Sequence, residues 1–378
     1  MPAYRVCLGT ALSVILISNP INTPAQPTLP DKHSKAGQVL PATEASTEPD
    51  SKLQWYPAEK LTIEGKGFAD TATWSSRLPA SSLDKVSTAV KGLASNCAGV
   101  AVRFATDSKS ISAVWDSVPP MDHMARTGSG GLDLYERKDG AWSYCGTGIA
   151  RSTRTLTRMG KMRSGTLTEY RLYLPLYSPV KELKIGIDAG AKLMPAADNR
   201  KDRLPVVFYG TSMTQGGCAS RSGMSHVAIL GRMLDRDTIN LGFSGSGKSE
   251  PIMAELLADI PASLYVLEPL PNMNADDNMV SDRIPPFVKI IRAKHPDTPI
   301  LLVQNPLSSN TSKQNTSLTK VFQGLKKEGV RNVSLLPSKG QLDGRENGTV
   351  DGVHPTDLGF NRMAECYYPV VKQLIAEK

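Results

Sequence analysis

The chain has few cysteines, no dense run of positive charge and no long apolar stretch, and each of these shortages excludes a class of protein. Its 5 cysteines, in 378 residues, form no Cys-x-x-Cys pair and no Cys/His cluster, so we expect neither a disulfide scaffold nor a zinc site. The net charge of +8 is not gathered into a Lys/Arg stripe interleaved with aromatic residues, so nucleic acid is not an expected partner. The clearest apolar run, residues 6–17, is too short to span a bilayer as a helix, and no other candidate span occurs.

The N-terminus has the pattern of a secretory signal peptide. Arg5 supplies a positive charge before the apolar run, and Ala25 supplies the small residue that a cleavage site needs. We therefore expect a signal peptide over residues 1–25 and a linker or disordered arm, rich in Pro, Thr and Ser, over residues 26–52. The mature protein is expected to be exported, either to the periplasm or to the medium.

Cleavage of this segment would remove Cys7 and leave four cysteines. An oxidising compartment would permit the pairings Cys97–Cys145 and Cys218–Cys366, with free buried thiols as the alternative.

Residues 53–198 have the pattern of an antiparallel β-sandwich of the jelly-roll type. Apolar residues alternate with period two in several short runs, turn residues separate these runs, and no convincing helix interrupts them. The predicted strands include residues 101–105, 111–115, 131–135, 170–174 and 183–187. We expect this part of the chain to be a domain of its own.

Beyond a charged junction at residues 198–203 the pattern changes to alternating strands and helices. Strands are predicted at 204–209, 237–242, 263–268, 298–303 and 331–336, with helices near 223–235, 249–259, 279–294, 315–328 and 358–376. Short apolar strands separated by amphipathic helices predict a three-layer α/β/α domain with a parallel sheet over residues 199–378. Ligands bind past the carboxyl ends of the strands in such a sheet.

A serine and an Asp/His pair fall at these strand ends. Ser212 follows the first strand in Gly210-Thr211-Ser212, where glycine permits a sharp turn into a helix. Asp351 precedes His354 by three residues, so the carboxylate can hold one ring nitrogen while the other faces outward as a base. Each piece alone also fits a helix cap or a loop cap, but together they suggest a serine hydrolase.

Two further strand ends offer hydrogen-bond donors for an oxyanion. Gly245 follows the second strand and could present a backbone N–H close to the reacting atom. Asn272 follows the third strand and could donate its amide to the same oxygen. Ordinary turn chemistry is the alternative interpretation of both residues.

These four blocks, in this order and on these strand ends, resemble those of the SGNH (GDSL-type) hydrolase family over residues 204–378. The resemblance implies that Ser212 is the nucleophile, that Gly245 and Asn272 are oxyanion donors with the Ser212 N–H, and that Asp351 and His354 complete the triad without a metal or another cofactor. The first block departs from the family by reading Gly-Thr-Ser instead of Gly-Asp-Ser, which removes no catalytic atom. The third has Pro-Asn-Met-Asn where the family usually has Gly-x-Asn-Asp, which leaves Asn274 as a competing donor to Asn272.

The first domain narrows this resemblance. Gly131-Leu132-Asp133-Leu134-Tyr135 is similar to the Gly-x-Asp-Leu-Tyr motif of a bacterial subgroup in which a β domain precedes the hydrolase. The architecture is similar to that of esterases that remove acetyl groups from polysaccharides, so the expected substrate is an acylated carbohydrate or a small ester, cleaved through an acyl-enzyme. Since fold does not determine substrate, the acyl group, the alcohol and the oligomeric state stay open.

Other functions compete with this interpretation. Residues 242–249 satisfy the P-loop pattern G-x-x-x-x-G-K-[ST] between a strand and a helix, but a nucleotide site would leave Ser212, Asn272 and the Asp/His pair unexplained. A lipase or thioesterase, and a glycan-binding protein with an inactive hydrolase domain, are further alternatives. His123 lies in a loop of the first domain that could reach the active site.

Overall fold

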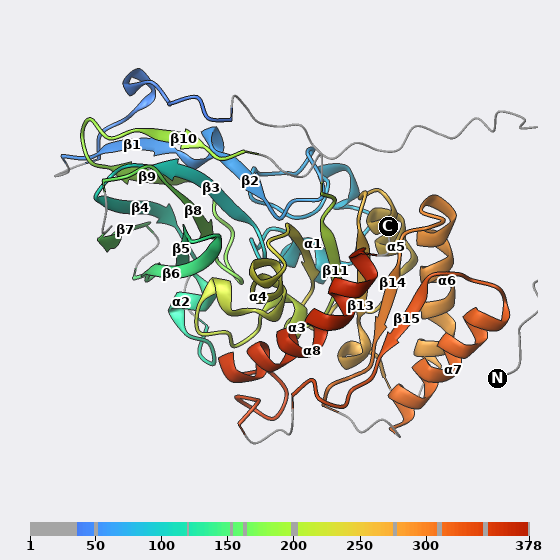
Figure 1. The fold of residues 1–378 in the computed structure, drawn as a ribbon. Helices are drawn as coiled ribbons and strands as arrows, with labels where there is room; N and C mark the ends of the chain where they lie inside the picture. The colour runs from blue at the N-terminus through green and yellow to red at the C-terminus, as the bar shows by residue number, and fades with distance from the viewer. Residues whose placement is uncertain are drawn as a thin grey trace, which may run out of the picture.

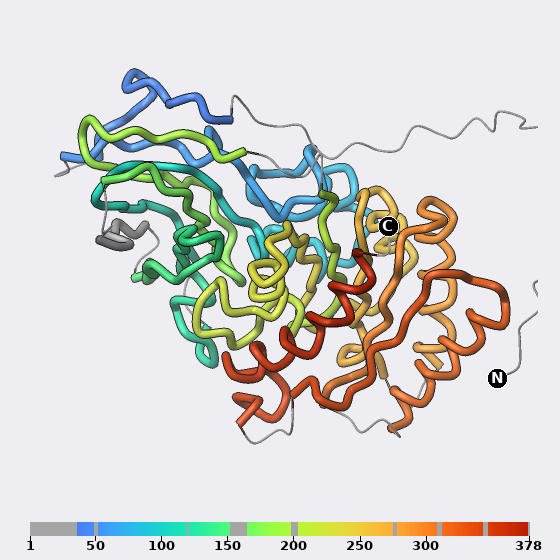
Figure 2. Tube along the Cα trace, in the orientation of Figure 1, coloured from blue at the N-terminus to red at the C-terminus, as the bar shows by residue number. Residues whose placement is uncertain are grey.

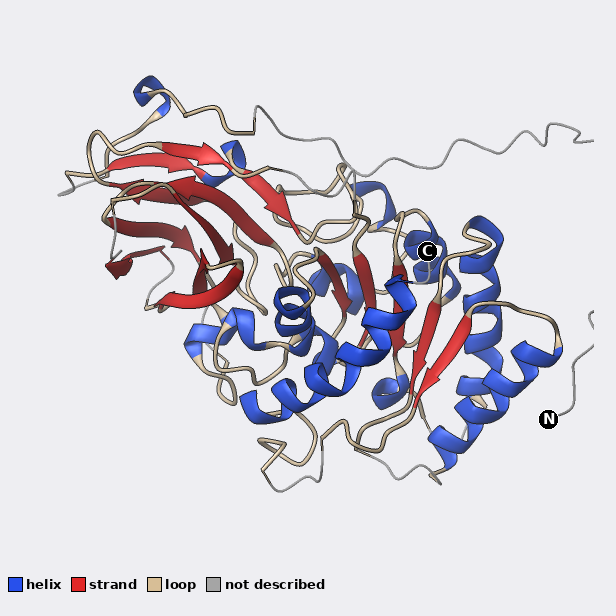
Figure 3. Cartoon of the chain, viewed as in Figure 1, coloured by secondary structure: helices blue, strands red, loops and turns tan. Residues whose placement is uncertain are grey.

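Two regions of different architecture pack against each other in the computed structural model of the chain (Figure 1). A β region, residues 53–197, contains two antiparallel sheets, and an α/β region, residues 203–376, contains one parallel sheet with helices on both faces (Figure 3). The structure describes residues 36–48, 52–118, 121–151, 154–161, 165–197, 203–274, 278–307, 312–342 and 347–376. The expected signal peptide, with Cys7, lies outside the described residues. Within them, no helix combines the length and the apolar character that crossing a bilayer requires.

The β region folds as an antiparallel sandwich, as its period-two pattern predicts. One sheet has the order β1-β9-β4-β7, and the other has the order β10-β3-β8-β5-β6, with β2 also paired to β3. The strands are β1 (Gln54–Pro57), β2 (Thr62–Glu64), β3 (Ala101–Thr106), β4 (Ser110–Asp116), β5 (Leu132–Lys138), β6 (Ala141–Gly148), β7 (Arg154–Lys161), β8 (Thr168–Tyr173), β9 (Leu183–Ile187) and β10 (Leu193–Pro195).

The core of the sandwich is built by alternate residues of the facing sheets. Trp115 of β4 and Ile185 of β9 pack in one cluster with Phe104 of β3 and Leu172 of β8, and all four side chains are fully buried. Burial of each such side chain contributes about 1.5–3 kcal/mol. The interleaved positions face away from this core, which is why the strands read with a period of two.

The prediction that no helix interrupts the β pattern is wrong for two short segments. Helix α1 (Thr88–Ala94) begins at Ser87, whose hydroxyl accepts the Val90 N–H at 3.3 Å. Val90 and Ala94 pack into the core of the α/β region, and Figure 2 shows this segment lying against that region. A helix of seven residues spans too few turns to produce a clear 3.6-residue period, so the sequence pattern did not reveal it. A second short helix, α2 (Arg126–Ser129), precedes β5.

The α/β region has five parallel strands in the order β12-β11-β13-β14-β15. The strands are β11 (Val206–Gly210), β12 (Thr238–Gly242), β13 (Leu264–Glu268), β14 (Ile300–Val303) and β15 (Val333–Leu336). The helices are α3 (Ser212–Gln215), α4 (His226–Met233), α5 (Pro251–Ala258), α6 (Met279–Lys294), α7 (Lys313–Lys327) and α8 (Asp357–Ala376). Every strand and helix that the sequence predicts in this region is present.

Helices cover both faces of the parallel sheet. Alternate residues of β11 show this: Val207 and Tyr209 pack in one cluster with α5, α6 and α7, while Val206 and Phe208 pack in another with α4 and α8. Figure 1 shows α8 lying across one face, with α6 and α7 beyond the other. Burial on both faces explains the continuous apolar strands of this region.

A buried arginine ties the α1 segment to the α/β sheet. Arg77 is 2% exposed and donates hydrogen bonds to the carbonyls of Asn96, Leu93, Asn240 and Gly242 at 2.7–3.1 Å. Burial lowers its pKa to about 10, so the guanidinium remains charged at neutral pH. The last two carbonyls belong to β12, so Arg77 supports the strand end that leads to Gly245.

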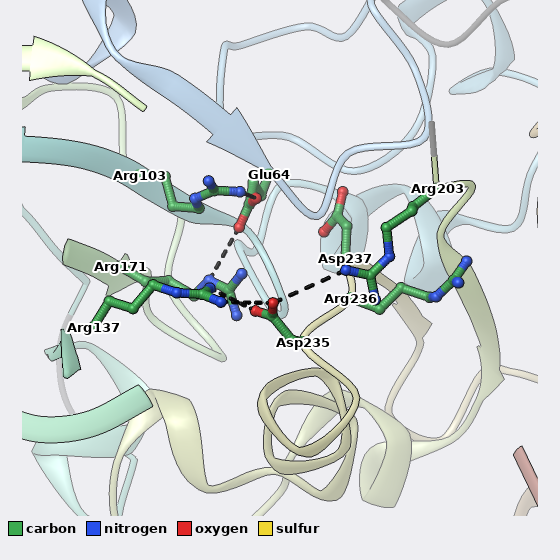
Figure 4. A pocket seen from close by; sticks show the side chains of 8 residues that line it. All are labelled: Glu64, Arg103, Arg137, Arg171, Arg203, Asp235, Arg236 and Asp237. Atoms are coloured by element: carbon green, nitrogen blue, oxygen red, sulfur yellow. Dashed lines mark hydrogen bonds and ion pairs between the residues drawn. The ribbon is translucent and has the colours of Figure 1, made fainter. Parts of the chain in front are cut away.

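Charged side chains meet where one sheet of the β region, through β2, β3, β5 and β8, approaches the turn after α4 (Figure 4). The Asp235 carboxylate in this turn accepts hydrogen bonds from both terminal nitrogens of Arg137, at 2.7 and 2.8 Å, and from the Trp142 indole N–H at 3.1 Å. On the β side, Glu64 bridges Arg103 and Arg171. The Arg137–Asp235 ion pair joins the two regions, while the Glu64 pairs lie within the β region beside it.

The four described cysteines are free thiols, so the pairings Cys97–Cys145 and Cys218–Cys366 are not formed. Cys97 is fully buried in the sandwich core, while the Cys218 thiol donates to the His123 carbonyl at 3.4 Å.

Candidate active site

The turn that carries Ser212 is shaped by its own hydrogen bonds. Thr211 caps α3 by accepting the Met213 N–H at 3.3 Å, and the Thr214 hydroxyl accepts the Thr211 N–H at 3.0 Å. A Cβ atom on Gly210 would lie 2.1 Å from that hydroxyl, so only glycine fits between β11 and the helix. The result places Ser212 at the first position of α3, beyond the carboxyl end of the strand.

Ser212, His354 and Asp351 form a continuous chain of hydrogen bonds. The Ser212 Oγ lies 3.0 Å from His354 Nε2, and His354 Nδ1 lies 2.7 Å from Asp351 Oδ2. The other carboxylate oxygen of Asp351 accepts the backbone N–H groups of Val353 at 3.0 Å and His354 at 2.7 Å. The structure thus brings together three residues that the sequence places up to 142 positions apart.

The hydrogen bonds around Asp351 keep its carboxyl group ionised. Partial burial alone would raise its pKa, but the hydrogen bonds from the His354 ring and from the two N–H groups lower it to about 2. Ser212 is 8% exposed, and the side chains of His354 and Asp351 are 22% and 40% exposed. A fixed carboxylate can orient the imidazole, whose Nε2 can then accept a proton from the serine.

The predicted oxyanion donors lie on turns that adjoin the Ser212 turn. Gly245 is in the left-handed region, with a φ of 66°, in the turn after β12. This turn contacts α3, because the Ser244 N–H donates to Gln215 Oε1 at 3.0 Å. The Asn272 amide is partly buried and donates to the Phe243 carbonyl in the same turn at 3.3 Å, whereas Asn274 is exposed. The oxyanion role of Gly245 and Asn272 stays a prediction.

The β region also reaches this site. The His123 ring centroid lies 6.1 Å from that of His354, so the loop predicted to be able to reach the site does so. Tyr177, which sequence reasoning missed, has its hydroxyl 3.5 Å from the Ser212 carbonyl, and burial raises its pKa to about 12. A Cβ atom on Gly217 would lie 3.0 Å from both the His354 ring and the Tyr177 hydroxyl. No sequence signal distinguishes Tyr177 from any other loop tyrosine.

His226 belongs to a buried network behind the site. It is fully buried, its ring stacks on Phe360, and its Nε2 lies 3.0 Å from Glu268 Oε1. The Tyr367 hydroxyl donates to the same carboxylate at 2.7 Å. This network joins β13, α4 and α8, and His226 is therefore a packed helix histidine.

Three side chains at this site have the donor types of a metal site. Ligand atoms of Cys218, Asp351 and His354 lie within 4.8 Å of one another. Both ring nitrogens of His354 are already in contact with Asp351 and Ser212, so a cation held here would replace the hydrogen bonds that proton transfer needs.

The P-loop pattern does not have the geometry that binds phosphate. A P-loop lysine and serine open a helix, but here α5 begins only at Pro251, and Ser249 has a φ of 57°. The residue that precedes the helix is Glu250, whose carboxylate would repel a phosphate. A Cβ atom on Gly247 would lie 1.9 Å from the Gly210 carbonyl, so this loop packs on β11, the strand that precedes Ser212.

Comparison with known proteins finds a family match for each region. The profile of the GDSL-like lipase/acylhydrolase family matches residues 203–372, and that of the N-terminal GxDLY domain of SGNH-type esterases matches residues 53–193. No curated protein matches the chain.

Solved structures resemble the whole two-region arrangement. A candidate GDSL-like lipase from Bacteroides ovatus is 34% identical with a TM-score of 0.81, over 86% of this chain and 98% of that one. The salicylyl-acyltransferase SsfX3 of a tetracycline biosynthetic pathway is 20% identical with a TM-score of 0.70, over 85% and 98%. An acetyl xylan esterase from Butyrivibrio proteoclasticus is 13% identical with a TM-score of 0.54, over 86% and 100%.

Proposed function

The chain belongs to the GDSL-like lipase/acylhydrolase family and is a carboxylic ester hydrolase, and from this premise we propose that it removes O-acetyl groups from carbohydrate through a Ser212–His354–Asp351 triad. The observation that carries the proposal is the unbroken chain of contacts from Ser212 Oγ through the His354 ring to Asp351, at 3.0 and 2.7 Å. These lengths are those of a nucleophile–base pair with an orienting carboxylate.

In the first step, Ser212 Oγ attacks the ester carbonyl carbon while its proton passes to His354 Nε2. The carbonyl π electrons move to oxygen, and the oxyanion accepts hydrogen bonds from the Ser212 and Gly245 N–H groups and the Asn272 amide. The tetrahedral intermediate collapses, the bond to the alcohol oxygen breaks, and His354 returns the proton to that oxygen. An acyl-serine remains.

In the second step, water takes the place of the alcohol. His354 accepts a proton from the water, hydroxide attacks the acyl-serine carbonyl, and the same donors hold the second oxyanion. Breaking of the ester to Ser212 releases the carboxylic acid, and His354 reprotonates Oγ. Asp351 stays ionised throughout, because its pKa of about 2 lies far below neutral pH.

Three observations support carbohydrate acetate as the substrate. A protein of the same fold is an acetyl xylan esterase, and the Gly-x-Asp-Leu-Tyr domain is joined to the hydrolase here. The His123 ring lies 6.1 Å from the His354 ring and the Tyr177 hydroxyl lies 3.5 Å from the Ser212 carbonyl, and side chains this close to the proposed triad favour a short acyl group over a long one. We also propose, from the N-terminal sequence, that the enzyme is exported to the periplasm or medium.

The test is acetate release from a panel of acetylated polysaccharides, with Ser212→Ala as the blank. Replacing the nucleophile is expected to lower turnover by about 10⁶-fold. A parallel series of p-nitrophenyl esters of increasing chain length separates an acetylesterase, whose rate falls with length, from a lipase. If the enzyme released no acetate from any polysaccharide and hydrolysed no small ester, the glycan-binding alternative would remain. Unchanged hydrolysis by Ser212→Ala would refute the triad.

A further inference from the structure

The Gly-x-Asp-Leu-Tyr segment lies in the β region and takes no part in the proposed chemistry, yet its aspartate is fully buried. A buried carboxylate is costly unless donors surround it. Asp133 Oδ1 accepts Arg221 Nη1 at 2.8 Å, and its Oδ2 accepts the Gly223 N–H at 3.0 Å and the Tyr135 hydroxyl at 3.3 Å. The two shortest of these bonds cross from the β region to the α/β region.

Other contacts hold the same stretch, which we call the 217–224 loop. The Ser222 hydroxyl donates to the Gly131 carbonyl at 2.8 Å, and the Thr127 hydroxyl donates to the Ser220 carbonyl. A Cβ atom on Gly223 would lie 2.7 Å from Asp133 Oδ2, so the loop backbone is in direct contact with the carboxylate. The motif therefore binds one segment of the other region through its first and third residues.

The 217–224 loop in turn contacts the turn that carries Ser212 and the segment that carries His354. At its start, the Gly217 N–H donates to the Ser212 carbonyl at 2.7 Å. In its middle, the Ser220 N–H donates to Asp357 Oδ1 at 2.9 Å, and the Ser220 hydroxyl donates to Oδ2. Asp357 is the first residue of α8 and follows His354 by three positions. The loop thus connects the serine turn to the segment that carries the imidazole.

We propose that Asp133 is a positioning residue of the esterase, which holds the 217–224 loop so that Ser212 and His354 stay within hydrogen-bond distance. The β region is then part of the catalytic machinery, in addition to any role in binding carbohydrate. This inference rests on the proposed function, because it takes Ser212 and His354 as the reacting pair. It assigns the Gly-x-Asp-Leu-Tyr motif a role in acyl transfer.

A carboxylate is needed at position 133 because its hydrogen-bond partners, Arg221, the Gly223 N–H and the Tyr135 and Thr147 hydroxyls, all donate. Asn has nearly the same shape, but its amide can accept only on one side. Its NH₂ group would face either Arg221 or the Gly223 N–H, both of which also donate. Asp133→Asn therefore disturbs the loop contact with little change in side-chain volume.

The chain offers a matched control in Asp235. Like Asp133, Asp235 accepts hydrogen bonds from an arginine of the other region, in this case Arg137 of β5 (Figure 4). Unlike Asp133, it has no hydrogen bond or ion pair with the described residues of the 217–224 loop. Its φ of 45° suits asparagine as well as aspartate, so Asp235→Asn should fold with only the ion pair weakened. Both variants weaken the contact between the regions, and only Asp133→Asn acts on the loop.

The experiment measures kcat, KM and the rate of Ser212 phosphonylation by a fluorophosphonate in the full-length enzyme, well below each variant's melting temperature. Asp133→Asn is expected to lower kcat and the phosphonylation rate together by about 10–100-fold, since small displacements of reacting groups have effects of that size. KM should change by no more than about 2-fold. Asp235→Asn should lower the melting temperature while both rates stay within about 2-fold of wild type.

Ser220→Ala tests the same connection without touching the buried carboxylate, so a poorly folded Asp133→Asn would not leave the idea untested. It should reproduce the loss of kcat, and the double variant should lose little more than either single variant, because both act through one contact path. Full kcat in Ser220→Ala, a change confined to KM in Asp133→Asn, or equal rates in Asp133→Asn and Asp235→Asn would overturn the inference. Hydrolysis that survives Ser212→Ala would instead overturn the proposed function itself.

Discussion

Asp351→Asn should abolish most of the activity through the tautomer of His354, and the structure shows why. The Asp351 Oδ1 accepts two backbone N–H groups, at 3.0 and 2.7 Å, so the oxygen of an asparagine side chain would take that place. Its NH₂ group would then face His354 Nδ1, where Oδ2 now lies at 2.7 Å. The ring would have to accept at Nδ1 and carry its proton on Nε2, where it could no longer take the proton of Ser212.

The expected loss in kcat is about 10⁴-fold. This corresponds to about 5.4 kcal/mol of transition-state stabilisation, at about 1.36 kcal/mol for each factor of ten. The change keeps the backbone contacts at position 351, so the melting temperature should move little. The assay is initial-rate hydrolysis of a chromogenic acetate ester, with the concentration of folded enzyme checked by circular dichroism. A kcat within tenfold of wild type would show that Asp351 does not orient the base.

Three further predictions follow from particular contacts. Asn272→Ala should lower kcat by about 10²–10³-fold, whereas Asn274→Ala should have little effect; the reverse result in steady-state assays would exchange their roles. Because the pKa of Asp351 is lowered from 3.8 to about 2, its contribution to stability is complete above pH 4 and is lost as the pH falls through about 2. The difference in unfolding free energy between wild type and Asp351→Asn should therefore be constant above pH 4 and shrink only below it, and a midpoint near pH 4 would contradict the assigned hydrogen bonds. Arg77→Met should destabilise the fold by about 3–5 kcal/mol in urea titration, because it removes the arginine donor from four carbonyls, three of them in buried hydrogen bonds, and a loss below about 1 kcal/mol would mean that water or other groups replace it.

The sequence predicts the α/β region well because one rule of geometry governs it. In a parallel sheet all carboxyl ends meet at one edge, so Ser212, Gly245 and Asn272 could be placed near one another once their strands were recognised. The strands are strongly apolar because helices bury both of their faces, which makes them easy to recognise. The same rule placed Asp351 and His354 beyond the last strand.

Contacts between the two regions could not be predicted in this way. Asp133 and Arg221 are 88 residues apart, and no periodicity relates a strand of one sheet to a loop of another region. The reach of His123 and Tyr177 toward the triad depends on how the two regions pack, which no local pattern encodes. The same is true of Arg77, whose four acceptors come from two segments, residues 93–96 and strand β12. The free thiols follow from that packing as well, since Cys97 is used as a core residue.

The central claim is that Ser212 is the nucleophile and that His354 activates it. The most direct measurement is peptide mapping by mass spectrometry after reaction with a fluorophosphonate, which loses fluoride when a serine oxygen attacks its phosphorus. We expect a single adduct on the peptide that contains Ser212, formed far more slowly in His354→Ala and absent in Ser212→Ala. An adduct on another serine, or labelling at the wild-type rate without His354, would contradict it.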